Sequence, residues 1–216
     1  MDYIKLSLIV IFVNAIQAIP MHQSEQHNII AINAPEKSEP DERFVKLAAS
    51  VREMVQCIQE VAKPESTTKT PSFGDLLCSR THETVECYDG FFEGVLMSIG
   101  EENITEAKSV VKKAFFRISE SLCKNDVFRD PNFRLLTLKF KLRQRECNMT
   151  DIVLRNGFTN WDSSVCEEME QSRLCVLSEF EEEDPVQVIW SDLVNAVTQP
   201  FMEQNHCQTG DDELYR

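Results

Sequence analysis

The chain has 216 residues, of which 42% are hydrophobic, and a formal net charge of −14 at pH 7. This hydrophobic content is sufficient for a core, which excludes a wholly disordered chain. The strong acidity argues against binding to nucleic-acid phosphates and against docking on an anionic membrane. We therefore expect a soluble protein whose partners include no nucleic acid.

Residues 1–18 have the organisation of a secretory signal peptide. Lys5 precedes an apolar run at residues 6–13, and Ala18 provides a small residue at a cleavage point before Ile19. The run is too short to span a bilayer, and no later segment approaches the roughly 20 apolar residues of a membrane-spanning helix. We expect a secreted, extracellular protein with no membrane span; a signal anchor is the alternative.

Residues 19–40 contain three prolines and no sustained period, so we expect a flexible arm. From Asp41 onward, apolar residues recur every three or four positions, as on one face of an amphipathic helix. Pro64 ends this first helix after Lys63, and residues 64–72 follow as a linker. The apolar face comprises Phe44, Leu47, Ala48, Val51, Met54, Val55, Ile58, Val61 and Ala62.

Two helical segments follow the linker. A short helix begins over residues 73–78, and a second helix, which contains Cys87, carries apolar residues over 85–99. Gly90 and Gly94 weaken this second helix by up to about 1 kcal/mol each relative to alanine, unless close packing uses their small size.

A third helix begins near Asn103 or Thr105, ends near Cys123 and completes the first half. Residues 125–131 then connect the two halves. Asn103 also opens the sequon Asn-Ile-Thr, and Asn148 opens Asn-Met-Thr. In a secreted chain each asparagine is a candidate glycosylation site.

Eight cysteines form two sets of four with similar spacing. The gaps are 21, 9 and 36 residues in the first set and 19, 9 and 32 in the second. We interpret this as the internal duplication of a four-cysteine helical module, over residues 41–124 and 125–207. An even number of cysteines in a secreted chain, without zinc-like Cys/His spacing, favours disulfides. The cysteines are Cys57, Cys78, Cys87, Cys123, Cys147, Cys166, Cys175 and Cys207.

The duplication decides the interpretation of the second half. Residues 136–142 alternate between apolar and polar side chains, which in isolation suggests a strand. However, residues 133–147 occupy the place of 44–57, so we expect a helix there. By the same correspondence, residues 161–166 match the short helix over 73–78.

The chain closes with two more helices. The acidic run 181–184 is expected to be a solvated helix end and not a calcium site, because no loop of alternating ligands is present. Pro185 suits the first turn of a last helix that reaches Phe201 and is interrupted near Pro200. Residues 208–216 are expected to form a disordered tail. The first of these two helices, which precedes the acidic run, corresponds to the second helix of the first half and carries Met169, Leu174, Leu177 and Phe180.

Helix direction favours one set of disulfides. Suppose that the first long helix of a module ends at the first cysteine and packs antiparallel to the helix that starts at the third cysteine. The first and third cysteines then meet at the same end of the two packed helices. Eight cysteines allow about a hundred pairings, so the assignment depends on the repeat and on helix direction, and pairing across the halves stays open. The favoured pairs are Cys57 with Cys87, Cys78 with Cys123, Cys147 with Cys175, and Cys166 with Cys207.

Short motifs around the cysteines form an ordered pattern between Phe44 and Cys207. They are Phe73-Gly-Asp-Leu-Leu-Cys78, Thr84-Val-Glu-Cys87, Asn103-Ile-Thr, Gln144-Arg-Glu-Cys147, Ser164-Val-Cys166 and Arg173-Leu-Cys175-Val-Leu-Ser-Glu. In order and spacing they resemble the insect secreted family named after a 27 kDa hemolymph glycoprotein, a domain of unknown function.

The resemblance implies a secreted protein and brings no agreed enzymatic activity. The family pattern has twelve cysteines, six in each half, and the first and fifth of each half are absent here. Residues near Leu136 and Glu183 occupy the second-half positions. The loss of the same two cysteines from both halves is what removal of one bridge per module would produce, which supports pairing within each half.

The sequence contains none of the catalytic motifs that we sought. His82 is the one histidine inside a module apart from His206 near the tail, and neither Gly-x-Ser-x-Gly nor His-Glu-x-x-His occurs. The six glycines form no phosphate-binding loop, and solvated helix faces explain most of the 36 acidic residues. We expect His82 to be an exposed helix residue, and we expect no enzyme, no metal site and no cofactor.

Two non-enzymatic functions remain for this all-α chain, which we expect to pack its two modules of about three helices each as one bundle-like unit. The first is a secreted binding or effector protein that recognises an extracellular protein in a fluid such as hemolymph, saliva or venom. The second is a carrier of an apolar small molecule between helices.

Adjacent aromatic residues are the feature that a carrier would use. One helix face cannot bury both members of an adjacent pair, so the surplus could line a pocket, join the modules or face a partner. Ordinary core packing is the alternative. The candidates are Tyr88, Phe91, Phe92, Phe115 and Phe116.

Overall fold

The computed structural model describes residues 42–63, 73–125, 133–178 and 187–207, and every regular element in these ranges is an α-helix. The expected all-α class is therefore confirmed. The expected signal peptide, arm and tail, the linker 64–72 and the acidic run 181–184 lie outside the described residues. The helices are α2 (Glu42–Val61), α3 (Phe73–Ser79), α4 (Thr81–Glu86), α5 (Asp89–Ile99), α6 (Ile104–Lys124), α7 (Phe133–Glu146), α8 (Met149–Asn156), α9 (Ser163–Leu177) and α10 (Gln187–Gln204).

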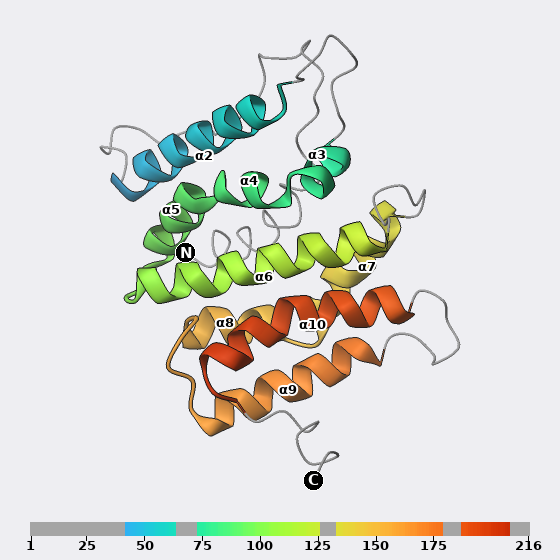
Figure 1. The fold of residues 1–216 in the computed structure, drawn as a ribbon. Coiled ribbons are helices and arrows are strands. Elements are labelled where there is room, and N and C mark those ends of the chain that lie inside the picture. Colours follow the sequence, from blue (N-terminus) through green and yellow to red (C-terminus); the bar gives the residue numbers. More distant parts are fainter. Residues whose placement is uncertain (1–41, 64–72, 126–132, 179–186, 208–216) are drawn as a thin grey trace, which may run out of the picture.

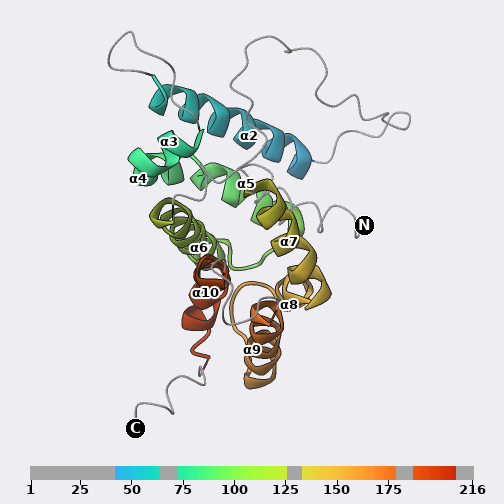
Figure 2. The same ribbon diagram turned by 90° about the vertical axis from the view of Figure 1, so that its right-hand side faces the viewer.

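Helices α6 and α10 form the centre of the molecule. They lie side by side in both views, with α2 to α5 on one side of the pair and α8 and α9 on the other (Figures 1 and 2). Their contact is the most extensive between any two described helices, followed by that of α2 with α5. Because α6 belongs to the first half and α10 to the second, buried residues of both halves form one continuous hydrophobic core.

All eight cysteines form disulfides, and each bridge stays within one half. The pairs match those favoured by helix direction, although the geometry differs between the halves. Cys87 lies in the turn between α4 and α5, close to the start of α5, whereas Cys175 lies near the end of α9 and not at the start of a helix. The bridges are Cys57 to Cys87, Cys78 to Cys123, Cys147 to Cys175, and Cys166 to Cys207.

The expected second helix is divided into α4 and α5. The N–H of Tyr88 donates to the carbonyl of Val85 at 3.0 Å, three residues back, and α5 resumes with the N–H of Phe92 donating to Tyr88 at 2.9 Å. This tightened turn ends α4, because an i→i−3 bond breaks the α-helical pattern. The prediction that Cys87 lies inside a helix was wrong: it occupies the position that follows α4.

Helix α8 was not predicted. Asn148 adopts a left-handed conformation (φ 60°), which ends α7 and turns the chain into α8. Met149, Ile152 and Val153 are buried, so α8 carries its own apolar face. In the first half, α2 continues past Cys57 to Val61. In the second half, α7 ends just before Cys147 and a separate helix, α8, follows.

The segment expected to match the short helix α3 is also different. Trp161 precedes α9, and Asp162 caps that helix by accepting hydrogen bonds from the N–H groups of Ser164 and Val165 at 3.0 Å. Cys166 and Cys175 therefore share one helix, whereas Cys78 and Cys87 lie in separate segments. The bridge pattern is repeated in the two halves but the helix boundaries are not, so internal duplication stays a prediction.

Pro200 does not interrupt α10, contrary to expectation. The helix continues to Gln204, and Pro200 itself is buried. A proline inside a helix removes one backbone hydrogen bond. Here the buried side chains of Phe201 and Met202, together with the bridge from Cys207 to Cys166, hold the last turn in place.

Candidate functional site

The candidate aromatic residues form a packed core, and none of them lines the groove described below. Tyr88, Phe92 and Phe115 are each 1% exposed. The ring centroids of Tyr88 and Phe115 are 4.7 Å apart, and those of Phe92 and Phe115 are 5.7 Å apart. Such separations are those of aromatic rings in direct contact. These three residues therefore belong to the ordinary hydrophobic core, which was the alternative to a ligand pocket.

The adjacent pairs are accommodated in two different ways. Phe91 and Phe92 are both buried, because α5 packs against α2 as well as against α6. The expectation that one member of this pair would be surplus was therefore wrong. Phe116 is partly buried and packs against the hydrophobic core.

Two hydroxyl groups inside this core have no hydrogen-bond partner among the described residues. They belong to Tyr88 and Thr84. Burial raises the pKa of Tyr88 far above its ordinary value, because the charged phenolate would lose its hydration. Tyr88 therefore remains protonated at physiological pH and is not available as a base.

A groove of about 720 Å³ opens at the surface where α6 and α10 meet. It carries charges of both signs, and Lys124 lies 3.5 Å from Asp192, so these charges largely neutralise each other. The groove is open to solvent and four of its ten lining residues are charged, whereas a site for an apolar ligand encloses most of the ligand surface. The residues that line it are Thr81, Arg117, Glu120, Ser121, Cys123, Lys124, Asp192, Asn195, Ala196 and Gln199.

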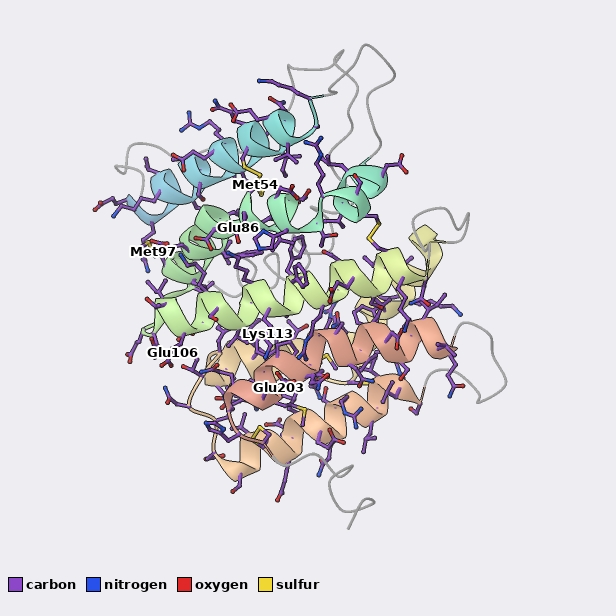
Figure 3. All side chains as sticks on the ribbon, viewed as in Figure 1. Met54, Glu86, Met97, Glu106, Lys113 and Glu203 are labelled. Carbon is purple, nitrogen blue, oxygen red and sulfur yellow. A yellow bond between two sulfur atoms is a disulfide. The ribbon has the colours of Figure 1, made fainter. Side chains whose placement is uncertain are left out.

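An ion-pair cluster crosses between the two central helices farther along. Lys113 and Arg117 of α6 both bind Glu203 of α10, and Figure 3 shows Lys113 and Glu203 extending toward one another. The Arg117 Nη2 to Glu203 Oε1 distance is 3.0 Å. The hydrogen bond from Lys113, and then that from Arg117, lowers the pKa of Glu203. This carboxylate thus helps to join the two halves.

Acidic residues of α4 and α5 are likewise paired with lysines of α6. Lys108 binds Asp89 at 2.9 Å and Glu93 at 3.0 Å, and Lys112 binds Glu86 at 2.7 Å. The hydrogen bond from Lys108 lowers the pKa of Asp89. Within the described ranges, no three His, Cys, Asp or Glu side chains are grouped so that they could hold a metal ion.

The remaining predicted positions lie at the surface. His82 is exposed on α4, and Asn148 is exposed directly before α8. Asn103 directly precedes α6 and is half-buried, and its Nδ2 donates to Oε2 of Glu106 at 2.6 Å. Glycosylation of Asn103 and Asn148 stays a prediction. No described helix is both long enough and apolar enough to span a bilayer.

Sequence reasoning missed an exposed apolar pair on α7. Leu138 and Leu142 are each 53% exposed, while Phe140 between them is buried. The signal was present in the sequence, because a helix places residues two positions from a buried side chain on its opposite face.

The comparisons with known proteins give no relative. The chain matches no family model, no curated protein and no solved structure.

Proposed function

We propose that the protein is a secreted, non-catalytic binding or effector protein that acts through its surface on another extracellular protein. Four disulfides support an oxidising compartment, since such bridges persist in secreted proteins and are rare in the cytosol. The proposal agrees with the resemblance to the hemolymph glycoprotein family. It does not depend on that resemblance.

The packing of the aromatic residues favours recognition of a partner at the surface over carriage of a ligand. A carrier needs an apolar space between helices. The rings of Tyr88, Phe92 and Phe115 fill the space between α5 and α6 by direct contact. The groove between α6 and α10 is open and charged. Recognition through exposed helix faces therefore has more support than carriage of an apolar molecule.

Native mass spectrometry tests this proposal. The protein is purified from a eukaryotic secretory host, deglycosylated and measured in native and denatured states. We expect the denatured mass to lie about 8 Da below that of the reduced chain, one hydrogen per bridged cysteine. We also expect the native mass to contain no small molecule.

Two results would contradict the proposal. A native mass increased by a few hundred daltons, with the added mass extractable into organic solvent, would establish carriage instead. A secreted, fully active protein with reduced cysteines would contradict the role of the bridges.

A further inference from the structure

Helix α7 has a charge opposite to that of the whole molecule. Its 14 residues, FRLLTLKFKLRQRE, contain five basic side chains and a single acidic one, in a chain whose net charge is −14. In Figure 2 it lies to one side of the pair formed by α6 and α10, and its most extensive contacts with described helices are those with α8 and α9. A cationic helix at the edge of an acidic protein is a surface of distinct chemistry.

The inward face of α7 is fixed by three contacts. The ring of Phe140 meets that of Trp190 in α10 edge to face, with centroids 5.3 Å apart. Gln144 is buried with its Nε2 3.5 Å from the Met149 sulfur, and Cys147, directly after the helix, is bridged to Cys175. These contacts determine which side of α7 faces the core, so they also determine which side faces outward.

The outward face carries an apolar ridge. Leu138 and Leu142 are one helical turn apart, and side chains four residues apart are neighbours on a helix surface. Both are 53% exposed. The other exposed large apolar residues are Val45 and Val51, six residues apart on α2, Leu174 on α9 and Val188 on α10. None of these is one helical turn from another, and scattered exposed apolar residues are common in folded proteins.

Basic side chains flank this ridge. Around the helix axis, the exposed Lys139 lies to one side of the line of leucines and the exposed Arg145 lies to the other. Arg143, by contrast, is turned inward: it donates to the carbonyl of Cys175 at 3.3 Å and forms an ion pair with Glu146 at 3.1 Å. Leu138, Lys139, Leu142 and Arg145 are called the α7 face below.

The chemistry of the α7 face selects among possible occupants. A second copy related by a two-fold axis would bring two cationic helices together, and like charges repel. An anionic bilayer is a wide plane of negative charge that would also face the acidic remainder of the chain, whereas a single helix is narrow enough to face α7 alone. An acidic amphipathic helix offers an apolar groove for the leucine ridge and carboxylates for Lys139 and Arg145, so both components are matched.

We propose that the α7 face is a docking surface for an acidic amphipathic helix of another extracellular protein. The inference rests on the proposed binding function and names the surface and the kind of partner.

A designed peptide provides the probe. It is an 18-residue fluorescent peptide with leucines at positions i, i+3, i+4 and i+7 and glutamates at the flanking positions; a second peptide has glutamine in place of every glutamate. Fluorescence anisotropy with the full mature protein is expected to show binding of the acidic peptide only. The affinity is expected to fall by about tenfold or more between low and high salt, because exposed charge pairs are screened.

Two double variants test the two components separately. Leu138→Ser with Leu142→Ser, and Lys139→Glu with Arg145→Glu, are each expected to weaken binding of the acidic peptide by about tenfold or more. The charge variant is also expected to lose the salt dependence. These positions are exposed, so circular dichroism and thermal unfolding should remain close to those of the unchanged protein.

The matched control removes exposed apolar side chains elsewhere. Val45→Ser with Val51→Ser on α2, where exposures are 50% and 36%, should change the affinity by less than about twofold. Equal weakening by the control, or no binding of the acidic peptide, would overturn the proposal.

Two further measurements separate the other occupants. Binding to vesicles of phosphatidylcholine and phosphatidylserine that requires the leucines would assign the face to a membrane. A dimer, detected by analytical ultracentrifugation and lost in the Leu138→Ser, Leu142→Ser variant, would assign it to a second copy. The proposed function fails by a different observation, a small molecule in the native mass spectrum, so the two failures are distinguishable.

Discussion

Gly94 lies where α5 packs against α2, and it has no room for a side chain. A Cβ at this position would lie 2.6 Å from the Ser50 Oγ and 3.5 Å from the Leu47 Cα. Ser50 is buried, and its Oγ donates to the Leu47 carbonyl at 2.8 Å, so moving it breaks a hydrogen bond. We expect Gly94→Ala to lower the free energy of unfolding by about 1–3 kcal/mol, measured by urea denaturation with the disulfides intact.

Gly90 provides the control within the same helix. Its added Cβ would meet no atom closer than the Glu53 Oε2 at 4.0 Å, and the residue is exposed. Gly90→Ala should therefore stabilise the protein by up to about 1 kcal/mol through helix propensity alone. If Gly94→Ala proved as stable as Gly90→Ala, the close approach of α2 and α5 would be wrong.

The hydroxyl of Tyr88 gives a second prediction for a single residue. It is buried without a hydrogen-bond partner in the described part of the chain, and an unpaired buried polar group costs about 1–3 kcal/mol. Tyr88→Phe keeps the ring contacts, so we expect equal or higher stability in thermal unfolding. Tyr88→Leu, which removes the ring, should be less stable. A loss of more than about 1 kcal/mol in Tyr88→Phe would indicate a partner for the hydroxyl.

Among the elements, α7 is held by the bridge from Cys147 to Cys175 and by one buried aromatic contact. Phe140 is buried against Trp190, whereas Leu138, two residues earlier, is half-exposed. Phe140→Ala should lower the free energy of unfolding by about 3–5 kcal/mol and change the fluorescence of Trp190, because a large buried ring is lost. Leu138→Ala should cost well under about 1 kcal/mol. Similar losses from both changes would favour a strand, which places the two side chains on one face.

Local sequence patterns predicted most of the helices. The apolar period over residues 44–62 fits the extent of α2, although Ala48 and Val51 of the predicted apolar face are exposed. The repeat of cysteine spacing favoured a helix at 133–147 where the alternation alone suggested a strand. The division at Tyr88 and the left-handed Asn148 were not predictable in this way, because single backbone conformations leave the apolar period almost unchanged. Continuation through Pro200 depends on burial against neighbours distant in sequence.

The candidate site shows the same division between local and tertiary information. The sequence identified the aromatic residues as a group, but whether adjacent rings are both buried depends on how many helices surround α5. The same reasoning applies to the α7 face: its charge and leucines can be read from the sequence, whereas their exposure requires knowing that Phe140 faces α10.

At the scale of the molecule, acid should weaken the joint between α6 and α10. Lys113 and Arg117 lower the pKa of Glu203 below its ordinary value of 4.5. The ionised carboxylate therefore stabilises the folded state above that value, and this contribution is lost as the pH falls below it. Because the Glu203 side chain is 36% exposed, the contribution should be below about 1 kcal/mol.

Glu203→Gln should therefore flatten the dependence of stability on pH between about pH 5 and pH 3, measured by urea unfolding at each pH. Glu102→Gln, at an exposed position before α6, should leave that dependence nearly unchanged. Equal curves for the unchanged protein and Glu203→Gln would show that Glu203 gains nothing from the two cations.

The arrangement of the bridges also defines what happens when the chain is cut. Every disulfide joins residues of the same half, so the peptide chain between Cys123 and Cys147 is the single covalent connection between the halves. Cleavage within residues 64–72 or 179–186 would leave both fragments linked until a reductant is added. One cut within residues 126–132 would instead turn the single chain into two internally cross-linked chains with no covalent link between them, kept together by noncovalent contacts, chiefly the packing of α6 against α10.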